Sequence, residues 1–396
     1  MGINLRAAER EASLTRASLW RELRRAIAEM LGMFVLPTLL VVGVVELAAW
    51  RLGVTWTPKQ TADALLASDK AIFLTDPTQH FLVKEEMVDR LRPEILVAGT
   101  SRVSQFRSAM FRPYGFYNIA NSVVIWKQFT NTLERLPAGY HPRVMIFTLD
   151  YFMFFHQLVD DMPWVLFHVS PLEAHLSGIK LMVETALRRD PRVLFSPARD
   201  PLNGGPAIGL PAVLGGGGFR RDGSAQYGFL FREGYPYSEV SLSAPLLGQL
   251  PLYFAEDFDA DQKQAFEEFV RKAHDLGIEL VGVTVPVWAG VVANADREAR
   301  MEAWRKFDSP AFALYLKSLN VHYENCLRLP SYYADRRYYI DSFHPTEPAI
   351  LACMIKMFEN PDIRALFPAI ALEPLRAKLA QDAAQADHID LYRFED

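Results

Sequence analysis

Short apolar runs alternate with amphipathic stretches through the middle and the end of the chain. We predict five strands from these runs, the last being the weakest: residues 95–98, 116–120, 144–149, 278–285 and 321–326. Helical periodicity separates them, and a further helix at 347–358 follows the last strand. Strands that alternate with helices are typical of a parallel sheet covered on both faces, so the pattern predicts an α/β fold.

The apolar pattern near the N-terminus is of a different kind. Residues 30–45 carry no charge, and the apolar character continues past Glu46 to Trp50. About 20 apolar residues are enough to cross a bilayer as a helix. Six arginines between Arg6 and Arg25 precede this run, so the positive-inside rule predicts a cytoplasmic N-terminus. An uncleaved anchor is expected rather than a cleaved signal peptide, because the run is long and no clear small-x-small site follows it.

These patterns predict a chain with an anchor followed by one large extracytoplasmic domain. The predicted parts are a cytoplasmic segment at 1–29, a transmembrane anchor at 30–50, a stalk with leading helices at 51–91, an α/β domain at 92–372 and a polar tail at 373–396. The α/β rhythm is interrupted by an insertion at about 151–250. Its glycine run at 215–223 is not followed by the Lys-Ser/Thr of a phosphate loop. We predict a surface loop there, with a substrate lid as the alternative.

Composition narrows the classes of function. Half of the 396 residues are hydrophobic, which allows a large core, and the net charge of −5 gives no support for nucleic-acid binding. The two cysteines, Cys326 and Cys353, exclude a disulfide scaffold and a four-cysteine zinc site, and are either two buried thiols or one bridge. The histidines lack zinc-ligand spacing, so no metal and no cofactor is expected.

The candidate chemistry lies at the two ends of the predicted α/β domain. The first strand stops at Gly99 and presents Ser101 on the next turn, at the sheet edge where open α/β folds place their sites. Asp341 and His344 are three residues apart near the other end, just before the closing helix. A serine hydroxyl needs a base to take its proton, and the base needs an acid to orient it. We therefore predict Ser101 as nucleophile, His344 as base and then acid, and Asp341 as the group that orients His344. Singly, such residues are more often turn, cap or helix-start residues.

These two motifs resemble those of the SGNH/GDSL hydrolase superfamily. Gly99-Thr-Ser-Arg102 stands where that family has Gly-Asp-Ser, and Asp341-Ser-Phe-His344 matches its last block. The resemblance covers about residues 92–360 in layout, although only the two short motifs are specific. It implies a three-layer sandwich around a parallel central sheet.

The predicted anchor makes the chain more similar to the membrane-tethered branch of that superfamily. That branch includes the teichoic-acid D-alanylation protein and the alginate O-acetylation proteins. These proteins move acyl groups onto glycans or cell-envelope polymers outside the cytoplasmic membrane, beside a multipass membrane acyltransferase. The resemblance therefore implies a glycan or acylated polymer as substrate, and the membrane and such an acyltransferase as partners.

Two of the family's other blocks differ in this chain. The second block has Asn118 but lacks the glycine that usually follows, and the third has Asp150 where an asparagine is usual. Both missing groups are donors for an oxyanion hole, and one lost donor can cost ~10²–10³ in rate. The Ser101 N–H and the Asn121 amide are the expected substitutes, unless Asn121 is only a turn residue. Arg102 is expected either to pair with Asp150, which would be an ordinary surface salt bridge, or to bind an anionic substrate.

Two functions remain open from the sequence. The first is a single-pass inner-membrane protein whose extracytoplasmic domain is a serine acyltransferase or esterase acting on an acylated glycan or cell-envelope polymer. The alternative is a catalytically inactive accessory protein of the same fold that binds a glycan or a multipass acyltransferase. A metal-dependent phosphodiesterase has the least support.

Overall fold

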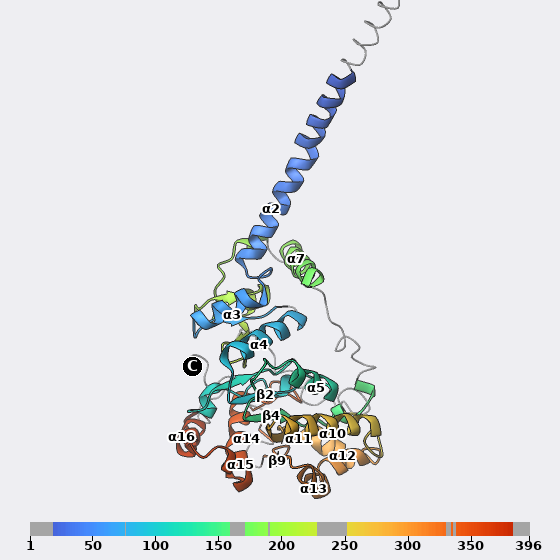
Figure 1. Ribbon diagram of the computed structural model, residues 1–396, viewed down its shortest axis with the longest axis vertical. Helices are drawn as coiled ribbons and strands as arrows, with labels where there is room; N and C mark the ends of the chain where they lie inside the picture. Colours follow the sequence, from blue (N-terminus) through green and yellow to red (C-terminus); the bar gives the residue numbers. More distant parts are fainter. Residues whose placement is uncertain are drawn as a thin grey trace, which may run out of the picture.

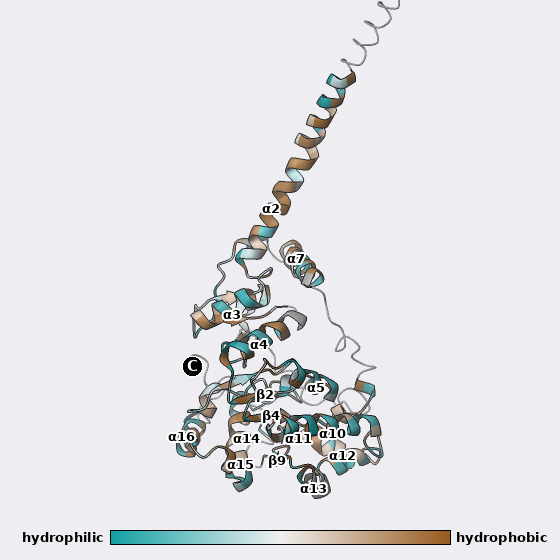
Figure 2. Ribbon diagram, viewed as in Figure 1, coloured by the Kyte–Doolittle hydropathy of each residue, from teal (hydrophilic) through white to brown (hydrophobic). Residues whose placement is uncertain are grey.

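The computed structural model of the 396-residue chain describes residues 19–75, 77–158, 171–188, 191–227, 252–329, 334–335 and 338–382. It consists of a long N-terminal helix that projects from a folded α/β body (Figure 1). This N-terminal helix runs from Leu19 to Arg51, with a π-helical turn η1 (Leu31–Val35) ahead of α2 (Leu36–Arg51). Its most apolar window has a mean hydropathy of 2.2, and the brown colour along α2 in Figure 2 shows this apolar character. The rest of the protein does not bury this window. The helix is long and apolar enough to cross a membrane, and it contains the predicted 30–50 segment.

The body is organised around a five-stranded sheet. Its strands are β2 (Ile95–Ala98), β3 (Phe116–Asn118), β4 (Val144–Thr148), β8 (Glu279–Thr284) and β9 (His322–Asn325). They lie in the order β3-β2-β4-β8-β9, and every neighbouring pair is parallel. The five predicted strands and the parallel sheet are therefore confirmed, with ends that differ by no more than two residues.

Helices cover both faces of this sheet. Leu96 and Met145 point to the face covered by α5 (Trp126–Glu134) and α10 (Ala260–Asp275), where Trp126, Phe266 and Phe269 fill the core. The alternate residues, such as Val97 and Ile146, point to the other face and pack against α14 (Glu347–Glu359). Each fully buried side chain of this size contributes ~1.5–3 kcal/mol relative to exposure. The central strands β2, β4 and β8 read as nearly continuous apolar runs because both of their faces are covered, whereas the edge strand β9 is polar and half-buried.

Shorter helices surround this core. They are α11 (Ala289–Arg297), α12 (Glu302–Phe307), α13 (Pro310–Ser318), α15 (Pro361–Leu366) and α16 (Leu372–Asp382), with 3-10 turns η3 (Ser108–Phe111) and η4 (Tyr151–Phe154). Leu375 and Leu379 of α16 are buried in the core. Residues 373–382 are therefore a packed helix and not part of a polar tail, whereas 383–396 lie outside the described residues.

A second, smaller sheet joins the predicted stalk to the predicted insertion. It has the order β5-β1-β6-β7, made of β1 (Ile72–Phe73), β5 (Ala207–Ile208), β6 (Gly217–Arg220) and β7 (Ala225–Tyr227). Strand β1 comes from the segment predicted as a stalk, between α3 (Pro58–Ala67) and α4 (Pro77–Leu91). That segment is thus part of the folded body, and the insertion supplies the strands on both sides of β1.

The prediction of a surface loop or lid at 215–223 is wrong, because residues 217–220 form the buried strand β6. Two glycines of this run, Gly218 and Gly223, are needed for close approach of the backbone. A Cβ on Gly218 would lie 2.6 Å from the Phe73 carbonyl oxygen, and one on Gly223 would lie 2.0 Å from the Asn118 carbonyl oxygen. The glycine run therefore reflects tight packing and not flexibility.

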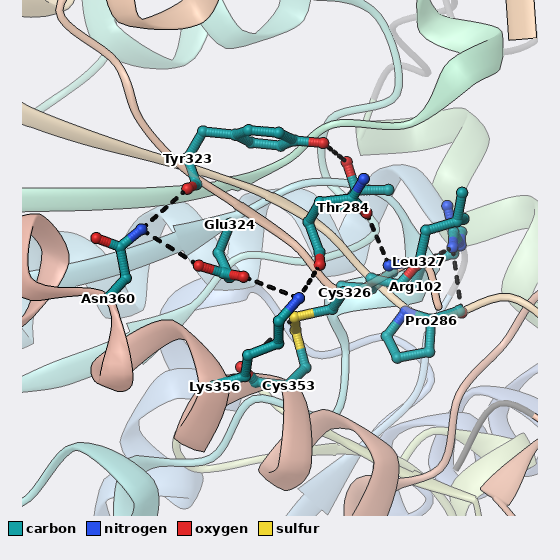
Figure 3. The surroundings of a disulfide bond; sticks show 12 residues. Arg102, Thr284, Pro286, Tyr323, Glu324, Cys326, Leu327, Cys353, Lys356 and Asn360 are labelled. Carbon is teal, nitrogen blue, oxygen red and sulfur yellow. Dashed lines mark hydrogen bonds and ion pairs between the residues drawn. A yellow bond between two sulfur atoms is a disulfide. The ribbon is translucent and has the colours of Figure 1, made fainter. Parts of the chain in front are cut away.

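Cys326 and Cys353 form a disulfide with a sulfur–sulfur distance of 2.14 Å. Cys326 follows β9 and Cys353 lies on α14, so the bridge joins the last strand to the closing helix (Figure 3). Disulfides persist mainly outside the reducing cytosol. Together with the N-terminal apolar helix, the bridge is consistent with a secreted or extracytoplasmic domain.

Candidate active site

The order of the strands creates a point where the chain changes direction. After β2 the chain passes to β3 on one side, and it then returns to β4 on the other side. In open α/β sheets, ligands bind outside the carboxyl ends of the strands at such a switch point. Ser101 follows β2 and Asp150 follows β4, so the sheet brings residues from two of the sequence motifs to this position.

The turn that carries Ser101 is fixed by its neighbours. Gly99 has a φ of +152°, and a Cβ there would lie 2.4 Å from Thr148 Cγ2, so only glycine fits. Thr100 then caps the short turn η2 (Ser101–Val103): its Oγ1 accepts a hydrogen bond from the Arg102 N–H at 3.3 Å and donates one to Asp150 at 2.7 Å. Ser101 is consequently the first residue of a turn whose backbone is held at both sides.

The structure brings Ser101, His344 and Asp341 together, although 240 residues separate the serine from the aspartate. Ser101 Oγ lies 2.6 Å from His344 Nε2, and His344 Nδ1 lies 2.7 Å from Asp341 Oδ2. The His344 and Asp341 side chains are 31% and 38% exposed. The three groups are therefore in proton-transfer distance and are open to a substrate from solvent.

The charge and the tautomer of this group follow from its hydrogen bonds. Burial acts to raise the pKa of Asp341, but hydrogen bonds from His344 and from the backbone N–H groups of Phe343 and His344 outweigh it, and the net pKa lies below the usual value. An ionised carboxylate only accepts hydrogen bonds, so His344 carries its proton on Nδ1. His344 Nε2 is then the acceptor for the Ser101 hydroxyl, which is the arrangement that general-base activation of serine requires.

Arg102 and Asp150 form a buried ion pair directly beneath this group. The Arg102 side chain is 6% exposed and the Asp150 side chain is fully buried. Arg102 also donates to the backbone carbonyls of Val285 (2.8 Å), Pro286 (3.3 Å) and Phe343 (3.1 Å). Figure 3 shows Arg102 beside Pro286, close to the disulfide.

The expected pairing of Arg102 with Asp150 is confirmed, and its placement corrects two other expectations. The pair is not on the surface, and neither side chain is placed to meet a substrate, because Asp150 is occupied by Arg102 and Thr100. Through the Phe343 carbonyl, Arg102 instead holds the residue next to His344. Arg102 and Asp150 are thus positioned as structural supports of the site.

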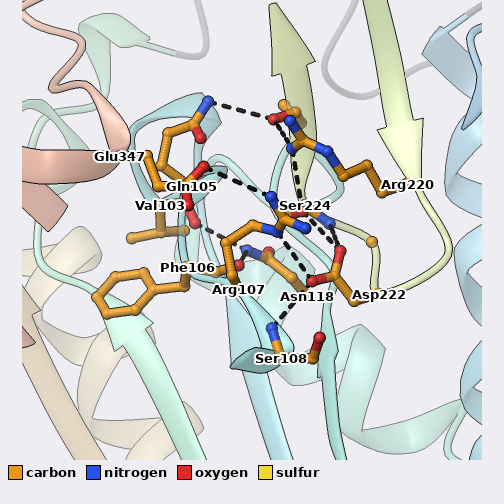
Figure 4. Close-up of polar contacts among 12 residues, drawn as sticks. Val103, Gln105, Phe106, Arg107, Ser108, Asn118, Arg220, Asp222, Ser224 and Glu347 are labelled. Atoms are coloured by element: carbon orange, nitrogen blue, oxygen red, sulfur yellow. Dashed lines mark hydrogen bonds and ion pairs between the residues drawn. The ribbon is translucent and has the colours of Figure 1, made fainter. Parts of the chain in front are cut away.

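Asn118 is also a support. It is fully buried, and its Nδ2 donates to the Val103 and Phe106 carbonyls at 2.8 and 3.0 Å while its Oδ1 accepts from the Ala120 N–H at 2.7 Å. Figure 4 shows it among these loops, beside an ion pair of Arg107 and Asp222. Its amide is used within the protein, so it does not face a substrate.

Asn121 remains a donor candidate for an oxyanion hole. It has a φ of +65°, is partly exposed, and its Nδ2 makes one long hydrogen bond of 3.4 Å to Ser104 Oγ. An amide nitrogen has two protons, so a second donor is available. The backbone N–H of Ser101 is the other candidate, because the first N–H groups of a helical turn have no acceptor within the turn.

Two supports of Asn121 could not have been found by sequence patterns. Lys84 donates to the Ala120 carbonyl at 2.6 Å and to the Gly223 carbonyl at 3.0 Å, and His80 Nε2 donates to the Asn121 carbonyl at 3.1 Å. Burial lowers the pKa of Lys84 well below its usual value. Both residues lie on α4, where a lysine and a histidine in an amphipathic helix look like surface residues.

Comparisons with protein-family models, with curated proteins and with solved structures found no match to this chain. Within the described part of the chain, no group of three or more His, Cys, Asp or Glu residues is arranged to hold a metal ion. The functional conclusion therefore depends on the arrangement of the site itself.

Proposed function

We propose that the protein is a membrane-anchored, extracytoplasmic serine esterase or O-acyltransferase with an SGNH-like three-layer fold. The observation that carries this proposal is the hydrogen-bonded series Ser101 Oγ–His344 Nε2 and His344 Nδ1–Asp341 Oδ2, at 2.6 and 2.7 Å. The strand order, the serine after the first strand and the Asp-x-x-His before the closing helix support the same fold.

The reaction proceeds in two acyl-transfer steps. Ser101 Oγ attacks the carbonyl carbon of an ester while its proton passes to His344 Nε2, and Asp341 stabilises the resulting imidazolium. The tetrahedral oxyanion is stabilised by the Ser101 N–H and the Asn121 amide. His344 then returns the proton to the leaving alcohol, and the acyl group remains on Ser101. A second hydroxyl, from a glycan or from water, gives its proton to His344 and takes the acyl group, and His344 passes the proton to Ser101 Oγ, which regenerates the serine.

The N-terminal helix acts in this proposal as an uncleaved anchor. Ala49 and Leu52 at its C-terminal end are fully buried in a core with Ala207 and Leu210 of the body. Cleavage at the end of the helix would remove Ala49 from that core. By the positive-inside rule, the six arginines ahead of the apolar 30–50 segment favour a cytoplasmic N-terminus and a body outside the inner membrane. From the resemblance to the membrane-tethered branch, we infer that the substrate is a cell-envelope polymer and that the partner is a multipass acyltransferase.

The site also has a feature that favours a second candidate function. Asp150 and Asn118, which occupy two blocks that usually supply oxyanion donors, are both used inside the protein. A protein with a weakened oxyanion hole would serve as a non-catalytic accessory that binds a glycan or a membrane acyltransferase.

One experiment separates the two functions. The full chain in detergent is treated with a fluorophosphonate probe and assayed with p-nitrophenyl acetate. We expect labelling of Ser101, and we expect Ser101→Ala and His344→Ala to lose turnover on the order of 10⁴–10⁶-fold. Ser318→Ala, on the surface helix α13, is the matched control and should keep full labelling and turnover. Folded wild-type protein without an adduct on Ser101 would exclude the enzyme and leave the accessory function.

A further inference from the structure

The C-terminal end of the N-terminal helix is enclosed by a second helix, α7 (Pro171–Arg188). Met182 and Ala186 of α7 are buried in one core with Ala48, Ala49 and Leu52. His175 Nε2 lies 3.3 Å from Glu46 Oε1, so a polar contact also joins the two helices. Figure 1 shows α7 foreshortened beside the lower end of α2, while α2 lies along the plane of the picture, so the two helices cross steeply.

Apolar side chains are unusually exposed on this part of the body. Outside the N-terminal helix, the described residues include eight exposed large hydrophobic side chains, and five of them lie between Leu172 and Phe195. Leu172, Leu176 and Leu187 are 66%, 55% and 80% exposed. Their spacings of four and eleven residues place them on one stripe of α7, which we call the exposed leucine stripe.

The exposed leucine stripe continues the apolar surface of the N-terminal helix. It lies next to the face that carries the buried Met182 and Ala186, and Leu181 is exposed on another side of α7. The short turn η6 (Pro191–Phe195) extends the surface around the same helix end: Phe195 is 65% exposed, and its carbonyl accepts a hydrogen bond from Arg51. Trp50, an aromatic residue suited to the membrane interface, is 56% exposed at this level.

We propose that α7 is an interfacial helix, which lies on the outer surface of the bilayer with the exposed leucine stripe among the lipid chains. A helix with an apolar stripe that crosses a membrane span at its exit point lies at the depth where lipid headgroups meet acyl chains. Apolar surface of this extent is seldom left in water, and here the nearest apolar medium is the bilayer that surrounds the N-terminal helix. The contact fixes the orientation of the body, because α7 and α2 together hold it to the membrane at two places.

This inference rests on the anchoring that is part of the proposed function and is independent of the chemistry at Ser101. It predicts contact between lipid and the exposed leucine stripe in a membrane that contains no other protein.

The test uses the full chain with single introduced cysteines. Both native cysteines are joined in a disulfide, so they do not react with a maleimide fluorophore. Leu176→Cys and Leu187→Cys report on the exposed leucine stripe. Leu314→Cys, a 67% exposed position on α13 at the far end of the body, is the matched control, and Val41→Cys within the N-terminal helix is the positive control. Each labelled protein is reconstituted in phosphatidylcholine vesicles with and without a nitroxide on the acyl chains.

We expect the probes at positions 176, 187 and 41 to lose emission in the nitroxide vesicles, and the probe at 314 to keep it. If 176 and 187 behave like 314 while 41 is quenched, α7 does not contact lipid and the inference is wrong. A blue-shifted but unquenched emission at 176 and 187 would show that a second copy of the chain covers the stripe, which also overturns it. Loss of quenching at 41 would refute the anchor itself, without affecting the labelling of Ser101.

Discussion

The buried ion pair beneath the candidate site makes a sharp prediction for Arg102→Met. The substitution removes the partner of Asp150, whose side chain is fully buried and would keep only the hydrogen bond from Thr100. It also removes the donor to the carbonyls of Val285, Pro286 and Phe343. Breaking a buried pair by removing one partner typically costs about 3–5 kcal/mol, because an uncompensated charge stays buried. We therefore expect the free energy of unfolding to fall by about that amount.

The double variant Arg102→Met/Asp150→Asn distinguishes this cause from simple loss of packing. It leaves no buried charge, so it should be more stable than Arg102→Met alone, although it carries more substitutions. Arg376→Met is the surface control: Arg376 pairs with Glu359 and Glu373 while 44% exposed, and such solvent-screened pairs contribute little to stability.

Urea unfolding of the detergent-solubilised full chain, followed by tryptophan fluorescence, measures these differences. Activity adds a second readout, because Arg102 no longer holds the carbonyl of Phe343, the residue beside His344. We expect a residual esterase rate in the double variant that exceeds that of Arg102→Met. The reasoning is refuted if the free energy of unfolding of Arg102→Met differs from that of wild type by less than ~1 kcal/mol, which is the most that an exposed ion pair usually contributes. It is also refuted if the double variant is no more stable than Arg102→Met.

Two other perturbations test the supports of the site. The Asp341 and His344 loop lies inside the 27-residue separation that the disulfide closes. Replacing Cys326 and Cys353 by alanine should lower the free energy of unfolding by about 3.5 kcal/mol on the chain-entropy estimate, measured by urea unfolding; an unchanged midpoint would count against a stabilising bridge. Burial raises the pKa of Asp222, but Arg107 and hydrogen bonds from Ser224 and Ser108 outweigh this effect and lower it to about 2. Since this folded-state pKa lies below the unfolded value of about 3.9, the stability it contributes is present above about pH 4 and is lost as the pH falls towards 2. The difference in unfolding free energy between wild type and Asp222→Asn should therefore shrink by about 2 kcal/mol from pH 5 to pH 2. A constant difference over this range would contradict the lowered pKa of Asp222 in the folded protein.

The sequence predicts the main sheet well because its signals are local. The central strands β2, β4 and β8 are short apolar runs, Ser101 follows the first of them, and the Asp341–His344 motif lies just before the closing helix α14. Once the strands are known to be parallel, their carboxyl ends share one edge, so Ser101 and the Asp341–His344 loop are expected on the same side of the sheet.

The second sheet shows where local signals fail. Strand β1 has two residues, Ile72 and Phe73, and its partners come from more than 130 positions further along the chain. Nothing near β1 in the sequence specifies that pairing. Gly218 and Gly223 look like part of a flexible loop because the reason for each glycine is a backbone that approaches from another segment.

What the sequence by itself determined is the type and the order of the elements of the main sheet and the apolar length of the N-terminal helix, since these depend on periodicity and composition within a short window. Only the tertiary structure decided which polar groups face solvent and which are used as supports. Asp150 follows β4 as Ser101 follows β2, Asn118 is the last residue of β3, and the same residue types would serve a substrate or a scaffold. Their function is set by the groups that the fold places around them, Arg102 for the one and the Val103 and Phe106 carbonyls for the other, because a buried polar group must be satisfied by whatever neighbours the folded chain supplies.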